Sequence, residues 1–213
     1  MKQLQVPFEA TLQPSGSLAT VAAYLNRAEK HPLAFAPWAQ YSYKPAVLFS
    51  VAHNNSLLFL QYEVSEAHVQ AAHFKTNGPV YQDSCVEFFI SLDDGATYYN
   101  FEFNCIGTVL AGYGRSKAER SWLPEEALDR ISSHTVIQKG GGEHNVRWEL
   151  TLVLPLTVFH FHSLVTLQGK RCRANFYKCG DHLPEPHFLA WSNIETESPN
   201  FHLPQYFGTV VFE

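Results

Sequence analysis

Residues 81–107, YQDSCVEFFISLDDGATYYNFEFNCIG, decide the fold, because they predict two β-strands joined by a tight turn. Polar and large apolar side chains alternate in both strands. Successive side chains of a strand point to opposite faces of its sheet, so one face would enter a hydrophobic core and the other would carry acids and amides. The polar set is Glu87, Asn100, Glu102 and Asn104. We predict that this polar face is a recognition surface.

Similar strand patterns continue after Pro45. They lie at residues 46–52, 57–64, 85–92, 98–108, 146–154, 171–178 and 207–212. Helices are few: Leu18, Val21 and Leu25 at helical spacing behind Ser17 predict one over residues 17–30, and PEEALDRI at 124–131 predicts a short second one. GGGEHN at 140–145 predicts a hairpin turn. The pattern indicates an all-β protein, an antiparallel β-sandwich with short peripheral helices.

Length and composition indicate one well-packed domain over residues 1–213. The chain has 46% apolar, 14% aromatic and 16% charged residues. Its net charge of -5 includes no Lys/Arg run, so we expect no nucleic-acid partner. We also expect no membrane partner and a cytoplasmic location, because no apolar run could span a bilayer and residues 1–13 do not read as a secretion signal. No oligomeric state is predicted.

Metal-capable residues give weaker signals. Cys85, Cys105, Cys172 and Cys179 have no C-x-x-C spacing, so we expect buried free thiols. A second group near the C-terminus has no known zinc spacing, and its histidines are expected to be solvated; it comprises Cys179, Asp181, His182, His187 and His202. Asp93 and Asp94 before Gly95 favour a hairpin turn, with calcium as the alternative. The prediction is no cofactor, with structural calcium left open.

The strand at 171–178 adds Arg173, Asn175 and Tyr177 to one face. If it shares a sheet with Glu87 and Glu102, that face would combine carboxylates, a guanidinium, an amide and a phenol, which suits a sugar. The alternative is a solvated face with ordinary ion pairs. Exposed rings could stack on a sugar, and the candidates are Trp38, Tyr81, Trp122, Trp191, Phe201 and Phe207.

Four motifs together resemble the family 9 carbohydrate-binding modules, in particular the stand-alone bacterial type. They are Y-x-D-S-x-V-E-x-F at 81–89, the strand at 98–107, RANFYKCGD at 173–181 and PNFHLPQYFGTVVFE at 199–213. The resemblance spans residues 38–213, which leaves residues 1–37 as an N-terminal extension with the helix. It implies an immunoglobulin-like β-sandwich that binds a saccharide and has no catalytic activity.

In that family two tryptophans clamp a sugar ring while a glutamate, amides and an arginine bind its hydroxyls. The tryptophan positions correspond here to Tyr81 and to Phe201 or His202, and the glutamate to Glu87. The resemblance and the polar face together predict a saccharide site and no catalytic residue. Its residues are Tyr81, Glu87, Asn100, Glu102, Arg173, Tyr177, Phe201 and His202. The resemblance also allows structural calcium.

Three alternatives remain open. A glycoside-processing enzyme could use Glu87 and Glu102 as acid and nucleophile, if their carboxyl groups lie about 5 or about 9 Å apart. A sandwich that has lost sugar binding could serve protein interaction. A haem-binding sandwich would need two histidine ligands, because the only methionine is Met1.

Overall fold

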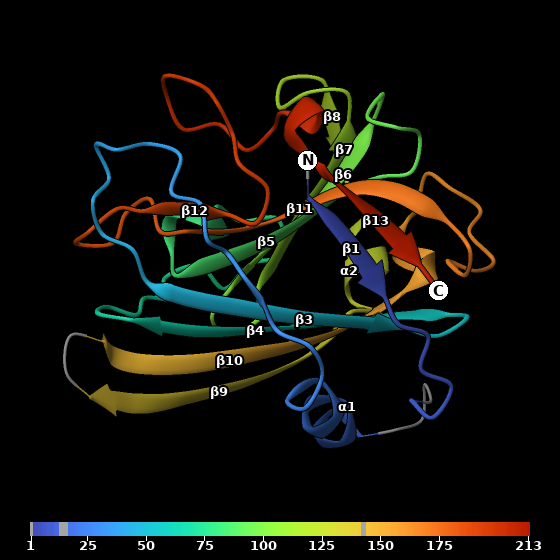
Figure 1. Cartoon of the computed structure of the whole chain (residues 1–213), viewed down its shortest axis with the longest axis horizontal. Coiled ribbons are helices and arrows are strands. Elements are labelled where there is room, and N and C mark those ends of the chain that lie inside the picture. Colours follow the sequence, from blue (N-terminus) through green and yellow to red (C-terminus); the bar gives the residue numbers. More distant parts are fainter. Residues whose placement is uncertain (1, 13–16, 142–143) are drawn as a thin grey trace.

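Two β-sheets pack face to face in the structure, a computed structural model that describes residues 2–12, 17–141 and 144–213 (Figure 1). The first sheet has the order β1 (Gln3–Val6), β13 (Gly208–Phe212), β11 (Arg171–Cys179), β5 (Cys85–Ser91), β6 (Tyr98–Asn104), β7 (Val109–Gly114) and β8 (Arg120–Trp122), and β12 (Phe188–Ala190) also pairs with β11. The second has the order β2 (His31–Pro32), β3 (Ala46–His53), β4 (Leu57–Glu66), β10 (His144–Pro155) and β9 (Ser132–Gly141). The predicted immunoglobulin-like β-sandwich is confirmed.

The main core lies between the two sheets and follows the predicted alternation. Phe88, Phe101 and Phe176 of the first sheet are at most 1% exposed, and the Phe176 ring stacks on Phe49 of β3 at 3.9 Å. Trp148 of β10 is fully buried in the same core. Each such side chain contributes about 2 to 3 kcal/mol by leaving water, so these rings hold the sheets together.

The predicted strand at 98–108 ends earlier than expected. β6 stops at Asn104, whose side-chain carbonyl accepts a hydrogen bond from the Thr108 amide at 3.0 Å. Gly107 has a φ of 87°, which favours glycine, and a Cβ there would crowd Ser133. The chain therefore turns here and returns as β7, a strand that the sequence pattern did not predict.

The N-terminal segment belongs to the sandwich and is more than an extension. β1 pairs in parallel with β13, whereas the other described strand ladders are antiparallel, and β2 pairs with β3. The predicted helix is present as α1 (Leu18–Leu25), capped by Ser17, whose hydroxyl accepts from the Thr20 amide at 3.2 Å. α1 covers the outer face of the second sheet (Figure 1).

The second predicted helix is present as α2 (Glu125–Leu128). The described residues also form three single turns of 3-10 helix: η1 (Val80–Gln82), η2 (Leu156–Val158) and η3 (Pro204–Tyr206). β9 and β10 form the predicted hairpin, but residues 142–143 of its turn lie outside the described residues. Of the helices in the described part of the chain, none has the length and apolar character needed to cross a membrane.

The outer face of the first sheet is covered by loops rather than by water. A second, smaller core forms there from sheet residues such as Phe89 and Tyr177 and from loop residues such as Trp38 and Phe201. The predicted polar face is part of this buried layer: Asn100 and Asn104 are fully buried. The alternative of a solvated outer face is therefore wrong. The buried layer is interrupted by a pocket.

Candidate functional site

A pocket of about 290 Å³ opens over β5, β6 and the end of β11 on the loop-covered face of the first sheet. Of the predicted ligand residues, it brings together Tyr81, Glu87, Glu102, Phe201 and His202. The remaining lining residues are Tyr41, Lys117, Arg120, Cys179, Asp181, Phe188, Pro199 and Asn200.

The floor of the pocket is built by two glutamates on neighbouring strands. Glu87 of β5 and Glu102 of β6 stand directly opposite each other in the ladder, and each is 3% exposed. Glu102 accepts a hydrogen bond from the side-chain amide of Asn100 at 3.0 Å, and its carboxyl group lies 3.8 Å from the Arg120 guanidinium. Glu87 accepts from the Cys179 thiol at 3.1 Å. β11, β5 and β6 are neighbours in one sheet, which is the condition for a shared polar face.

Negative charge is crowded on this floor. Burial raises the pKa of Glu87 well above its ordinary value; Glu102 and Asp181 add to the shift, while the Cys179 hydrogen bond and Arg120 oppose it. Burial also raises the pKa of Glu102, with Arg120 and Lys117 acting in the opposite direction. Carboxyl groups that hold their protons more tightly can donate as well as accept hydrogen bonds, as a ligand with many hydroxyl groups requires.

Aromatic rings form the wall above the floor. Phe201 stacks on Tyr177 with centroids 4.1 Å apart and planes at 10°, and the Tyr177 hydroxyl donates to the Phe201 carbonyl at 3.2 Å. Tyr177 is fully buried, so it supports the Phe201 ring instead of lining the pocket. Tyr81, the middle residue of the single turn η1, lines the pocket, and Tyr41 packs on Phe188 with centroids 4.7 Å apart.

His202 is held as a neutral ring. Burial, then Arg120 and Lys117, lower its pKa to about 3. Its Nε2 lies 3.2 Å from the Arg120 guanidinium, which can only donate, so Nε2 accepts and the ring proton sits on Nδ1. Nδ1, 3.0 Å from the Tyr98 hydroxyl oxygen, then donates to it. His202 thereby fixes the Arg120 head group beside Glu102.

Three predicted ligand residues lie outside the pocket lining. Tyr177 and Asn100 are buried behind it, where Asn100 hydrogen-bonds Glu102. Arg173 lies farther along β11, where its Nη2 donates to the Phe207 carbonyl at 2.7 Å and its Nη1 lies 3.6 Å from Asp94. The guanidinium at the pocket is that of Arg120.

Sequence reasoning missed Arg120 and Lys117 because both lie in the β7–β8 hairpin, which the strand pattern did not assign. Gly114 pairs with Arg120 across this hairpin, and a Cβ on Gly114 would collide with the Glu119 carbonyl oxygen. Glycines that permit so close a backbone approach are the signal that could have located the hairpin.

The calcium candidates do not fit a calcium site. Asp93 accepts hydrogen bonds from the Thr97 amide at 2.9 Å and the Ser91 hydroxyl at 2.8 Å, and Asp94 has a φ of 58°, so the segment is the predicted turn. With the Asp93 oxygens committed to the turn and Asp94 facing Arg173, no set of calcium ligands is assembled there.

The metal-capable residues near the C-terminus do not form a metal-ligand set with one another in the described part of the chain, although Cys179, Asp181 and His202 line the same pocket. His187, expected to be solvated, is fully buried and bonded to Lys178, whereas His182 is exposed. All four cysteines are buried and free, as predicted.

Comparisons with known proteins agree with this fold. The model of carbohydrate-binding family 9 matches residues 19–212, which begins earlier than the expected resemblance and includes most of α1. A crystal structure of a candidate carbohydrate-binding protein from Bacteroides uniformis ATCC 8492 is 39% identical, has a TM-score of 0.89, and is matched over 100% of this chain and 99% of that one. None of the curated proteins matches the sequence.

Two structures of a family 9 carbohydrate-binding module from Caldicellulosiruptor kristjanssonii share the fold at 13% identity. One was solved with glucose and the other with cellotriose, and their TM-scores are 0.59 and 0.62. Each match covers 100% of this chain, with 96% and 94% of the respective chain of the module. Since the family model spans nearly the whole chain, this protein belongs to carbohydrate-binding family 9.

Proposed function

We propose that the pocket over β5 and β6 binds a saccharide without catalysing a reaction. Tyr81 and Phe201 contact the apolar C–H face of a sugar ring, while Glu87, Glu102 and the Arg120 guanidinium bind its hydroxyl groups. The observation that carries this proposal is the presence of rings, carboxyls and a guanidinium around one cavity of about 290 Å³. Apolar walls with a few convergent polar groups are the usual composition of a small-ligand site.

The electrostatic balance of the floor favours a neutral polyhydroxylated ligand. Glu87, Glu102 and Asp181 face Lys117 and Arg120 in the same cavity, so neither charge sign dominates. A hydrogen bond from the charged Arg120 guanidinium to a sugar hydroxyl is stronger than a neutral one and contributes about 1.5 to 3 kcal/mol. A sugar can donate to the acids and accept from the guanidinium at the same time.

The glycosidase alternative is less well supported by the same geometry. Glu87 and Glu102 do line one pocket, as that alternative requires. However, a retaining pair needs one carboxylate ionised as the nucleophile, whereas burial raises the pKa of both groups. Glu87 is also committed to the Cys179 thiol. We therefore place the chain among non-catalytic binders.

Calorimetric titration tests the proposal. Glucose and cellotriose are the first ligands because the related module was solved with them, followed by an array of mono- and oligosaccharides. We expect one saccharide per chain, and Glu87→Gln should weaken binding at least about tenfold. Glu149→Gln, on the second sheet, is the matched control and should bind as wild type. Absence of binding to every saccharide tested would reject the proposal, as would release of product from aryl glycosides.

A further inference from the structure

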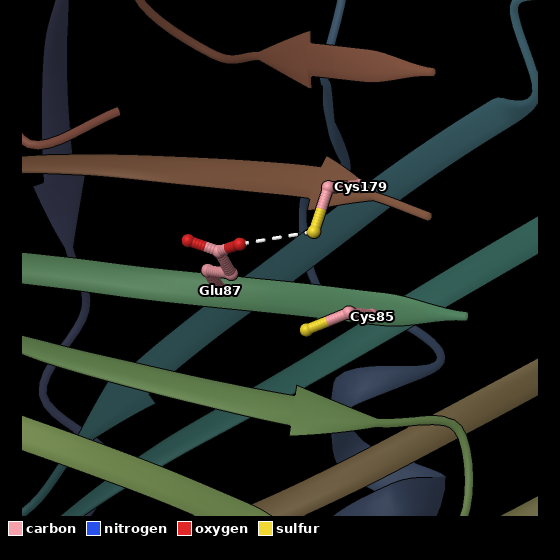
Figure 2. Close-up of side chains that lie close together, drawn as sticks. All are labelled: Cys85, Glu87 and Cys179. Carbon is pink, nitrogen blue, oxygen red and sulfur yellow. Dashed lines mark hydrogen bonds between the residues drawn. The ribbon is translucent and has the colours of Figure 1, made fainter. Parts of the chain in front are cut away.

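Two cysteines and a glutamate converge on the floor of the pocket from adjacent strands. Cys85 of β5 and Cys179 of β11 stand directly opposite each other in the ladder, and Glu87 follows Cys85 by two residues, so it lies on the same face. Figure 2 shows the Cys179 sulfur and the Glu87 carboxyl between the two strands, joined by their hydrogen bond, with the Cys85 sulfur nearby over β5. One potential ligand atom from each residue lies within 4.8 Å of the other two.

This grouping is specific to these residues. Over residues 2–12, 17–141 and 144–213, no other set of three or more His, Cys, Asp or Glu side chains comes together in this way. Cys105 and Cys172 are equally buried but lie in the core between the sheets. Three donors on two rigid, hydrogen-bonded strands are held in place by the backbone.

We propose that Cys85, Glu87 and Cys179 form a binding site for a thiophilic divalent cation of the Zn²⁺ or Cd²⁺ type. Two sulfur ligands and one carboxylate oxygen are a donor set that such ions accept in tetrahedral sites. Tetrahedral Zn–S bonds of about 2.3 Å place two sulfurs about 3.8 Å apart, so side-chain rotations of modest size close the site. The fourth position faces the pocket, where water or a ligand hydroxyl can fill it.

The ion has a route to the site. Cys179 and Glu87 line the pocket, although they are only 1% and 3% exposed, while Cys85 lies behind them with no exposed surface. A hydrated ion entering the pocket would therefore meet Glu87 and Cys179 first and Cys85 last.

Binding of the ion displaces protons from the cluster. Both cysteines are buried, and their thiols must lose their protons to bind the cation, so the affinity should rise with pH. Arg120 lines the same pocket as Glu87 and Cys179 and offsets part of the negative charge near Glu87. The displaced protons pass to the buffer.

Cadmium titration of the phosphine-reduced protein tests the site, because Cd²⁺ bound to thiolates absorbs in the ultraviolet. We expect the absorption to saturate at one Cd²⁺ per chain. The double variant Cys85→Ala/Cys179→Ala should lose it, and Glu87→Gln should keep it with at least about tenfold weaker affinity. The matched control Cys105→Ala/Cys172→Ala, which also removes two buried thiols, should bind as wild type. Wild-type protein without the absorption, or absorption that survives in Cys85→Ala/Cys179→Ala, would overturn the site.

A second measurement needs no variant and so does not depend on their folding. Wild-type protein is alkylated at a denaturant concentration below its unfolding transition, and the modified cysteines are mapped by mass spectrometry. One equivalent of Zn²⁺ should protect Cys85 and Cys179 from alkylation. Equal alkylation of these two cysteines with and without Zn²⁺ would contradict the proposal. Neither readout involves a saccharide, so this site can fail while sugar binding stands, and the reverse.

Discussion

Glu66 of β4 and Lys178 of β11 form a fully buried ion pair between the two sheets, with 2.9 Å between Oε2 and Nζ. Trp148 donates its indole N–H to the other Glu66 oxygen at 2.6 Å. The Lys178 ammonium also donates to the Cys179 carbonyl at 2.9 Å and to His187 Nε2 at 2.8 Å. This cluster ties β11 to the second sheet at the residue that precedes Cys179, and thereby positions one edge of the pocket floor.

Removing one member of this pair should destabilise the fold strongly. Glu66→Gln leaves a buried ammonium without its counter-charge, and we expect the free energy of unfolding to fall by about 3 to 5 kcal/mol. Urea denaturation followed by tryptophan fluorescence measures it. Glu149→Gln breaks a half-exposed pair with Arg147 instead, and should cost no more than about 1 kcal/mol. Similar losses for the two variants would show that burial of the pair is unimportant.

Acid should weaken the fold through two buried histidines. Burial, then Lys178, lowers the pKa of His187 to about 3, and burial with Arg120 does the same for His202. Below about pH 6.5 the unfolded chain binds a proton at each histidine and the folded chain does not. The contribution of these histidines to the free energy of unfolding should therefore fall between about pH 6.5 and 3, by up to about 1.4 kcal/mol per pH unit for each histidine. Glu87 and Glu102, whose pKa values are raised by burial, act in the opposite direction, so the test compares variants with wild type.

Denaturation at pH 7, 6 and 5 measures this slope. His187→Gln can still accept from Lys178 but cannot titrate, so its slope should be shallower than that of wild type. The exposed His134→Gln on β9 is the control and should leave the slope unchanged. A wild-type slope in His187→Gln would refute the assignment.

The two arginines on the first sheet should behave differently toward a saccharide. Arg120 lines the pocket beside Glu102, whereas Arg173 is bonded to the Phe207 carbonyl and does not line it. We expect Arg120→Ala to weaken saccharide binding at least about tenfold and Arg173→Ala to change it less than about twofold. Calorimetry on both variants provides the comparison. If Arg173→Ala weakened saccharide binding more than Arg120→Ala did, the ligand arginine would be Arg173, as the sequence alone predicted.

The size of the aromatic ring at position 81 should determine the affinity for a saccharide. Tyr81→Trp offers a larger stacking face and should tighten saccharide binding a few-fold, while Tyr81→Ala should weaken it about tenfold or more. Phe74→Ala removes a ring that is 72% exposed and does not line the pocket, so it serves as the control. If Tyr81→Ala bound as tightly as wild type, stacking at this position would have no part in recognition.

Much of the fold could be predicted from the sequence because strand alternation is a local property. Phe88 and Phe101 enter the core, and Glu87 and Glu102 face the other way, as their spacing implies. Among the strands that went unrecognised, three have weak alternation: β7 and β8 are short and contain glycine or arginine, and β9, SSHTVIQKGG, is largely polar.

The candidate site could be predicted only in part. Tyr81, Glu87 and Phe201 were found because they occupy positions of a recognisable motif. Arg120 was not, because its place beside Glu102 depends on a hairpin that folds back onto β6. Nor could the sequence show that loops bury the polar face, because this burial depends on the tertiary packing of distant segments, for example the loop that contains Trp38.

The sequence by itself determined the sandwich class, the inward and outward faces of its central strands, and the glutamate and tyrosine of the pocket, because each follows from neighbours a few positions away. Only the tertiary structure decided that Cys85 faces Cys179 and that Glu66 reaches Lys178. Those residues are far apart in the chain, and the register of β5 on β11 and the packing of one sheet on the other bring them together.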